Sequence, residues 1–445
     1  MKNLGITRDY SCEYFNPELE TMTRTQIEAL QLERLRSTVR HCMNSEFYRK
    51  RFEEAGLKPE DIRTLDDLRK IPFTTKQDLR DTYPFGMASV PLEQCTRLHS
   101  SSGTTGNPTV ILHTDKDIDE WANQVARNLW MVGLRPNDVF QNSSGYGMFT
   151  GGLGFQNGAE KLGMLTVPAA AGNSLRQIKF IKDFGTTAIH AVPSYLGRLK
   201  EVMDQEGVDP RRDTKLRVFA IGAEPHSEEQ RKRIEEMFGV KAYNSFGMSE
   251  MCGPGVGFEC KEQNGLHFWE YYYIVEIVDP ETLEPVPDGE IGELVLTSLC
   301  REAMPLLRYR TRDLTRVLGR SCPCGRNHIR LDRMRGRSDD MIVLKGVNIF
   351  PIQIEKILMK FKELTTNYLI TLTTDNDNDN MTVEVEVNNF DLNDKDKVQQ
   401  LTKEITRALK DEILLTPHVK LLPLGSLPQS EGKAVRVKDF RKVYQ

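Results

Sequence analysis

The 445-residue sequence lacks any run of eighteen apolar residues, and its opening residues hold no apolar stretch behind a basic start. We therefore expect neither a membrane-spanning helix nor a secretory signal peptide. A basic excess is also missing, because 60 Lys and Arg residues face 64 Asp and Glu residues and leave a formal net charge of -4. This balance argues against nucleic-acid and membrane partners, so small molecules are the expected ligands.

The eight cysteines do not form the pattern of a disulfide scaffold, since they are scattered at positions 12, 42, 95, 252, 260, 300, 322 and 324. Scattered cysteines are typical of a reducing compartment, and we expect a cytoplasmic protein. The chain is also longer than one ordinary core requires, which predicts two or more domains.

The loop at residues 99–110, HSSSGTTGNPTV, carries the strongest local signal of function. Its glycines allow the backbone to approach a ligand closely, and its hydroxyls are short donors suited to phosphate oxygens. The residues expected to cradle a triphosphate are Ser101, Ser102, Gly103, Thr104, Thr105 and Gly106. No Gly-Lys-Ser/Thr follows, which disfavours a P-loop kinase or ATPase. Taken alone, the loop fits a solvated linker equally well.

The sequence pattern predicts an α/β protein with a large multi-layer N-terminal domain, residues 1–336, and a small C-terminal α+β domain, residues 337–445. Spaced apolar residues over 25–56 predict an amphipathic helix within a helical segment of about residues 1–90. Short apolar runs then alternate with charged helical stretches, as in α/β layers. In the small domain we expect strands at 367–374, 381–387 and 419–422 and a helix at 394–414.

Several further motifs follow the loop in order along the chain. They are YNSFGMSEMCGPGV at 243–256, YRTRDL at 309–314, GRSDDMIVLKGVNIFPIQIE at 336–355, and SEGKAVRV around Lys433. With them the chain resembles the adenylate-forming superfamily of acyl-CoA synthetases. GYGMFTGGLG at 145–154 and GAEP at 222–225 make the phenylacetate-CoA ligase family the closest resemblance, which spans nearly the whole chain.

The resemblance implies an enzyme that converts an aromatic acid, phenylacetate first, to its CoA thioester. A carboxylate is a poor electrophile, so displacement of pyrophosphate from ATP first makes an acyl-adenylate, and the CoA thiolate then displaces AMP. Two anions meet in the first step, so fixed donors, a cation and Mg²⁺ should supply electrostatic stabilisation. ATP, Mg²⁺ and coenzyme A are the implied cofactors and co-substrates.

The same resemblance assigns roles to residues of the nucleotide site. The loop from Ser101 to Gly106 would hold the β- and γ-phosphates, and Lys433 would bridge the carboxylate and the α-phosphate. Ser249 would contact phosphate and Glu250 would hold Mg²⁺, while Asp313 and Arg337 would bind the ribose. The adenine pocket would comprise Gly222, Ala223, Glu224, Asn244, Ser245, Phe246 and Gly247.

One position departs from the family pattern, because Asn107 stands where the phosphate loop usually carries lysine. ATP should then bind or react less well unless another cation compensates. Asp339 matches the hinge about which the small domain would swing between adenylating and thioester-forming poses, bringing Lys345 and Gly346 toward the pantetheine channel. An ordinary turn before a strand is the alternative for Asp339.

The aromatic ring of the acid is expected to lie in a flat apolar pocket. Its predicted lining is Tyr146, Gly147, Phe149 and Pro254, in glycine-rich stretches beside Phe246. Core packing is the alternative explanation for these side chains.

A separate structural zinc site is predicted from Cys260, His267, Cys322 and Cys324, because three cysteines and one histidine are an accepted tetrahedral ligand set. Cys252 and His328 are the substitute ligands. Buried free thiols are the alternative. A closed site of this kind would support the fold and not the chemistry.

Two other functions stay open from the residues themselves. One is an enzyme that makes an acyl phosphate or an amide from the activated acid; the other is a non-catalytic nucleotide-binding relative, which the missing loop lysine favours. A homodimer is expected from analogy of fold alone.

Overall fold

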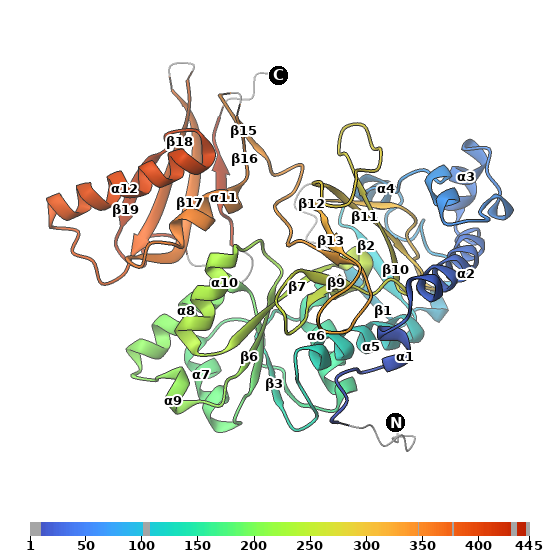
Figure 1. The fold of residues 1–445 in the computed structure, drawn as a ribbon, viewed down its shortest axis with the longest axis horizontal. Coiled ribbons are helices and arrows are strands. Elements are labelled where there is room, and N and C mark those ends of the chain that lie inside the picture. Colours follow the sequence, from blue (N-terminus) through green and yellow to red (C-terminus); the bar gives the residue numbers. More distant parts are fainter. Residues whose placement is uncertain (1–9, 101–106, 346, 376–377, 429–433, 442–445) are drawn as a thin grey trace.

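The computed structural model describes residues 10–100, 107–345, 347–375, 378–428 and 434–441, and it shows two bodies of unequal size (Figure 1). The larger body, blue through yellow in Figure 1, is built around a nine-stranded sheet, and the smaller, orange to red, around a four-stranded one. Helices pack on both sheets, so the predicted α/β class is confirmed.

The large sheet joins a parallel half to an antiparallel half in the order β13-β14-β9-β8-β7-β6-β5-β3-β4. Its parallel strands are β3 (Val139–Asn142), β4 (Leu165–Val167), β5 (Ala188–Ala191), β6 (Val218–Gly222) and β7 (Lys241–Met248). Beyond β7 follow β8 (Gly253–Glu259), β9 (Leu266–Phe268), β14 (Arg330–Leu331) and β13 (Val317–Gly319), each antiparallel to the strand before it in the sheet.

Strand β6 shows why the parallel strands have continuous apolar sequences. Its five residues are all buried. Val218 and Ala220 belong to one apolar core, whereas Phe219 and Ile221 belong to another on the opposite face. Helices therefore cover both faces, as parallel sheets require. The covering helices are α5 (Asp115–Met131), α6 (Thr150–Leu162), α7 (Ser174–Asp183), α8 (Pro193–Gln205), α9 (Pro210–Asp213) and α10 (Glu228–Phe238).

Two smaller sheets complete the large body. One is the antiparallel set β10 (Tyr273–Val278), β11 (Gly292–Ser298) and β12 (Tyr309–Thr315), and the other is the pair β1 (Arg97–Ser100) and β2 (Val110–His113). The phosphate-loop motif connects β1 to β2, but residues 101–106 lie outside the described part of the chain.

The helical start differs from the prediction of one helix over residues 25–56. The structure has α2 (Arg24–Cys42) and α3 (Glu46–Glu54), with α1 (Pro17–Glu20) before them and α4 (Lys76–Asp81) after them. The chain leaves the helical conformation at Ser45, whose backbone is extended and whose hydroxyl donates to the Gly86 carbonyl. This tertiary contact overrides the continuous apolar spacing.

The small body has its own apolar core, drawn from residues 342–437. Its sheet has the order β19-β18-β17-β20, with β17 (Leu364–Asp375), β18 (Asn378–Val387), β19 (His418–Leu422) and β20 (Val437–Asp439). Helix α12 (Lys395–Ile413) buries Leu401, Ile405, Leu409 and Ile413 at four-residue spacing. The hairpin β15 (Ile342–Leu344) and β16 (Val347–Ile349) and helix α11 (Pro351–Leu358) precede this sheet. The predicted strands and helix of this region are confirmed.

Among the residues that the structure describes, no helix is both long and apolar enough to cross a membrane.

Candidate active site

A cavity of about 570 Å³ opens where β6 and β7 end, between these strands, β12 and the segment that leads to the small body. Ligands of open α/β sheets bind at this edge, outside the carboxyl ends of the strands. Predicted site residues from four separate motifs line the cavity, namely Ala223, Glu224, Asn244, Ser245, Phe246, Gly247, Glu250, Asp313, Arg337 and Asp339.

Close backbone approach fixes the wall between β6 and β7. A Cβ at Gly222, the last residue of β6, would overlap the carbonyl oxygen of Ser245. The next residue, Ala223, has a φ of 69°, which returns the chain sharply toward the cavity. Glycine at position 222 therefore allows the end of β6 to lie this close to β7, directly before Ala223, which lines the cavity.

Glu250 lies on a short 3-10 turn after β7, and its side chain is 8% exposed. Its Oε1 accepts a hydrogen bond from the Tyr309 hydroxyl at 3.3 Å, and the Lys76 Nζ lies 4.0 Å from the same oxygen. The neighbouring Ser249 Oγ lies 3.2 Å from Thr150 Oγ1 and is not among the lining residues. A carboxylate here faces the cavity with acceptor capacity left for a ligand.

Asp313 and Arg337 are brought together by a backbone bridge between their strands. The Arg337 guanidinium makes two hydrogen bonds of 2.8 Å each to the carboxylate of Asp339. Burial raises the pKa of Asp339, but this bidentate pairing outweighs it and the pKa lies below its ordinary value. The ribose and hinge candidates therefore belong to one cluster at the cavity rim.

Known proteins match this chain in sequence and in structure. Residues 51–300 match the family described as AMP-binding enzyme, and residues 346–441 match its C-terminal domain. The phenylacetate-coenzyme A ligase of Thermus thermophilus is 44% identical over 444 residues, covering 96% of this chain and 100% of that relative. The chain belongs to the phenylacetate-coenzyme A ligase family.

Two solved structures of 2-hydroxyisobutyryl-CoA ligase, each 28% identical, cover 99% of this chain and 95% of their own. The TM-score is 0.93 for its postadenylation state with 2-HIB-AMP and 0.73 for its thioesterification state with 2-HIB-AMP and CoA. The two structures are of the same relative and cover the same share of this chain, so the difference in TM-score reflects how the two bodies are arranged. The large and small bodies of this ligase-family chain are therefore arranged as in the postadenylation state.

Some predicted residues of this family member lie outside the described part of the chain. They are the loop from Ser101 to Gly106, Gly346 and Lys433. Ala434 is described, and its backbone N–H donates to Glu224 Oε2 at 3.2 Å. Lys345, in the turn between β15 and β16, has a φ of 49° and does not line the cavity.

Glu224 is expected only to line the adenine pocket, but it also makes contacts outside the cavity. It lines the cavity, but its carboxylate also accepts from the backbone N–H of Ser194, at the start of α8, and from the Ser194 hydroxyl at 3.0 Å. Together with the Ala434 contact, these bonds make Glu224 a junction between the cavity wall, α8 and the C-terminal tail.

The predicted acid-pocket residues Tyr146, Gly147, Phe149 and Pro254 do not line the 570 Å³ cavity. The Tyr146 hydroxyl accepts from Asn142 Nδ2 at 3.0 Å, and Phe149 is 55% exposed. Pro254 is paired in register with Gly247, which does line the cavity. An aromatic pocket on this side of β7 stays a prediction.

Sequence reasoning missed the basic residues that surround the cavity, which are Lys76, Arg80, Arg310, Arg312 and Arg333. Lys76 and Arg80 come from α4, far from every recognised motif. A backbone bridge between Thr74 and Tyr309 helps to place α4 at the cavity, with Thr74 N–H donating to Arg308 O at 3.0 Å. No local pattern signals such a contact, because one bridge joins segments over two hundred residues apart.

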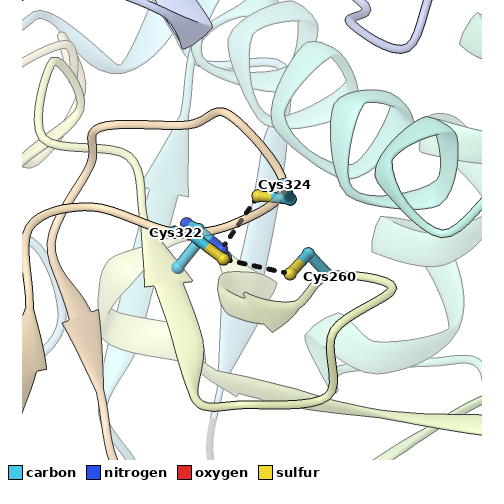
Figure 2. A group of neighbouring side chains, drawn as sticks. Cys260, Cys322 and Cys324 are labelled. Atoms are coloured by element: carbon cyan, nitrogen blue, oxygen red, sulfur yellow. Dashed lines mark hydrogen bonds between the residues drawn. The ribbon is translucent and has the colours of Figure 1, made fainter.

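The four predicted zinc ligands come together near the end of β8, and Figure 2 shows the three cysteines among them. One ligand atom from each of Cys260, His267, Cys322 and Cys324 lies within 4.8 Å of the others, and three of the four residues are buried. Cys260 Sγ is 3.7 Å from Cys322 Sγ, and Cys324 Sγ is 3.6 Å from His267 Nε2. A tetrahedral zinc ion would place two thiolates about 3.8 Å apart, and a thiolate and an imidazole nitrogen about 3.6 Å apart.

The substitute ligands are placed elsewhere. His328 Nδ1 accepts from the Glu270 N–H at 3.3 Å, and its Nε2 lies 2.8 Å from the Leu19 carbonyl oxygen. Neither His328 nor Cys252 belongs to the group of four.

Proposed function

We propose that the protein converts an arylacetic acid, phenylacetate first, to its CoA thioester through an acyl-adenylate, with release of AMP and pyrophosphate. It is an acid–CoA ligase by its near-complete match to phenylacetate-coenzyme A ligases. The observation that carries the proposal is the convergence of four adenylate-forming motifs on one cavity at the carboxyl ends of β6 and β7.

The polar lining supports a nucleotide in this cavity. Asn244 and Phe246 would hold the adenine edge and face, and Asp313 with Arg337 would hold the ribose. The buried carboxylate of Glu250 fits Mg²⁺, a hard cation that prefers oxygen ligands, and the ion would neutralise charge on the phosphates. Ser249 and the loop from Ser101 to Gly106 remain the proposed phosphate donors, and Lys433 the proposed bridging cation.

We propose that Lys76 supplies the positive charge that the phosphate loop lacks because Asn107 replaces the usual lysine. Four of the cavity arginines are already paired with carboxylates: Arg310 and Arg312 with Glu293, Arg333 with Glu228, and Arg337 with Asp339. Lys76 keeps a half-exposed ammonium group 4.0 Å from the proposed Mg²⁺ carboxylate. A flexible ammonium in this place can follow the phosphates as pyrophosphate departs.

The acid would enter beside Phe246 and Gly247, where the glycine-rich segments with Tyr146, Gly147, Phe149 and Pro254 approach β7. The register of Gly247 with Pro254 supports this position. Coenzyme A would reach the acyl-adenylate after the small body swings about Asp339, which would bring Lys345 and Gly346 toward the channel. The match to one of two states of a relative supports this swing, with the domain boundary at residues 336 and 337.

The proposal includes a structural zinc ion held by Cys260, His267, Cys322 and Cys324. The donor set and its 3.7 Å and 3.6 Å separations fit the edges of a tetrahedral site. The ion would join the β8–β9 connection to the β13–β14 connection, away from the reacting groups. A cytoplasmic location and a homodimer stay predictions of the sequence.

A pyrophosphate-release screen tests the function. Phenylacetic, benzoic and indole-acetic acids are each supplied with ATP and Mg²⁺, with and without coenzyme A, to the full chain and to Lys433→Ala. We expect AMP and pyrophosphate with phenylacetate, and at least a hundredfold loss of adenylation in the variant, as for removal of one transition-state donor. Lys403→Ala, an exposed lysine on α12, is the matched control.

Other products would identify other functions. ADP and phosphate would indicate phosphoryl transfer, and ATP binding without turnover of any acid would indicate a non-catalytic relative. Lys433→Ala with the unmodified rate of AMP formation would contradict the assignment of the bridging cation.

A further inference from the structure

The two bodies meet at the segment of the large body from Glu224 to Arg233 and along α8. Glu355 of α11 accepts from the Ser227 N–H at 2.7 Å. One and a half turns further along α10, Arg233 donates to the carbonyl oxygens of Phe361 and Leu364. A cavity of about 550 Å³ runs along the same boundary between α8 and β17, so the contact is a polar, partly hollow surface and not a shared core.

The Glu355 contact completes a helix cap that the large body leaves open. Ser227 is the N-cap of α10, and its hydroxyl accepts from the Gln230 N–H at 3.1 Å. In a capping box, the Gln230 side chain would accept from the Ser227 N–H in return. The Gln230 side-chain amide is buried and has no hydrogen-bond partner among the described residues, and the carboxylate of the other body accepts from the Ser227 N–H in its place.

The surroundings of Glu355 make this cap sensitive to protonation. Glu355 is 2% exposed, and its Oε2 accepts from the Tyr368 hydroxyl at 3.1 Å. The pKa of Glu355 is raised from an ordinary 4.5 to about 7, chiefly because the group is buried; Glu224 adds to the rise, whereas Arg436, Ser227 and Tyr368 oppose it. Burial lowers the pKa of the adjacent His226 to about 3, so that ring is neutral. On α8, Arg198 and Glu201 pair with each other at 3.2 Å.

We propose that Glu355 is a positioning residue that selects the adenylating arrangement by capping α10 across the boundary between the two bodies. This inference rests on the proposed function and on the swing within it. Undocking exposes the carboxylate to water and breaks its bond to Ser227. Docking brings it next to Glu224, whose Oε2 also holds the Ala434 N–H, directly after Lys433. Glu355 thus acts by placing the small body against α10, and it touches no reacting atom.

The sign of the pH effect follows from the two pKa values. Below pH 4.5 the carboxyl is protonated in both arrangements, and pH has no effect through this group. From pH 4.5 to 7 only the undocked form loses its proton, so docking weakens as pH rises, and above pH 7 the effect is constant. With pKa values of 4.5 and about 7, docking should weaken about tenfold between pH 6 and pH 8.

Hydrogen exchange of the peptide that contains Ser227 measures docking without any substrate. After correction for intrinsic exchange, we expect its protection in the unmodified full chain to fall about tenfold from pH 6 to pH 8. Glu355→Gln keeps an acceptor for Ser227 but carries no charge, so its protection should not change over this range. Glu404→Gln, an exposed carboxylate on α12, should behave as the unmodified chain does.

A second variant tests docking without altering charge. A Cβ at Gly197 of α8 would overlap the Thr366 hydroxyl of β17, so Gly197→Ala should separate the two surfaces. We expect it to slow pyrophosphate release at least tenfold at every pH while thioester formation from supplied acyl-adenylate is spared. Thr366→Ala in the same chain removes the clash and should restore adenylation.

Two results would overturn the inference. One is a Glu355→Gln protein whose Ser227 protection keeps the unmodified pH dependence, and the other is a Gly197→Ala protein in which both half-reactions slow equally. A chain that fails to activate any acid but shows the exchange pattern would instead refute the proposed function alone.

Discussion

Removal of the proposed zinc ion is the perturbation whose size the structure predicts most directly. The ion would connect Cys260, at the end of β8, to Cys322 and Cys324, which lie between β13 and β14 (Figure 2). Cys324→Ser replaces a thiolate with a hydroxyl that zinc binds poorly at neutral pH. Because the site lies outside the nucleotide cavity, the variant should lose stability before it loses chemistry.

The magnitude follows from the chain that the ion closes. Cys260 and Cys322 are 62 positions apart. Closing a loop of that length restricts the unfolded chain by about 4 kcal/mol on the loop-entropy estimate used for covalent cross-links. For a domain of this size, such a loss lowers the midpoint of urea unfolding by about 1 M. Addition of a chelator to the unmodified protein should give the same shift.

The assay combines metal analysis with unfolding of the full chain. We expect one zinc ion per chain in the purified protein, none in Cys324→Ser, and a full complement in Cys95→Ser, which removes a thiol outside the cluster. The pyrophosphate-release rate of Cys324→Ser at low temperature should stay within about threefold, since the ion supports the fold. Protein without zinc, or zinc retained in full by Cys324→Ser, would refute the site.

Further predictions concern the cavity and the hinge. Lys76→Met should raise the Michaelis constant for ATP about tenfold, as expected for loss of one charged contact, and Asn107→Lys in that variant should reverse part of the loss; an unchanged constant would exclude Lys76 from phosphate binding. Gly222→Ala should abolish ATP binding by calorimetry, because its methyl group meets the Ser245 carbonyl. Asp339→Pro should slow thioester formation more than adenylation in single-turnover assays, and two unimpaired half-reactions would show that position 339 is no hinge.

Much of the site could be predicted because its parts are local. The turn after β6 requires small residues, and the end of β7 carries its polar motif within a few positions, so sequence alone indicates both. The hairpin of β17 and β18 follows from alternation in residues 367–387. These features depend on neighbours in the chain, which a sequence displays directly.

The remainder depends on contacts between distant segments. Lys76 is placed at the cavity by contacts between distant segments, such as the pairing of Thr74 with Tyr309, and neither of these residue types indicates its partner in the sequence. The break between α2 and α3 depends on the Ser45 hydroxyl and the Gly86 carbonyl. The dual role of Glu224 requires both the start of α8 and the tail to be in place. Local propensity cannot foresee such pairings, because tertiary packing decides them.

The distribution of charge around the cavity explains why one cation should be mobile. Arg310, Arg333 and Arg337 form salt bridges with carboxylates, so they line the cavity in fixed positions and their positive charge is largely neutralised. In the proposed mechanism, adenylation is the step that brings a carboxylate against an α-phosphate, so positive charge is needed there and then. The proposed source of that charge is Lys433, which directly precedes Ala434, whose backbone N–H donates to Glu224. Withdrawal of this lysine after adenylation would free the same face of the acyl-adenylate for the incoming thiol, which a cation fixed in the cavity wall could not do.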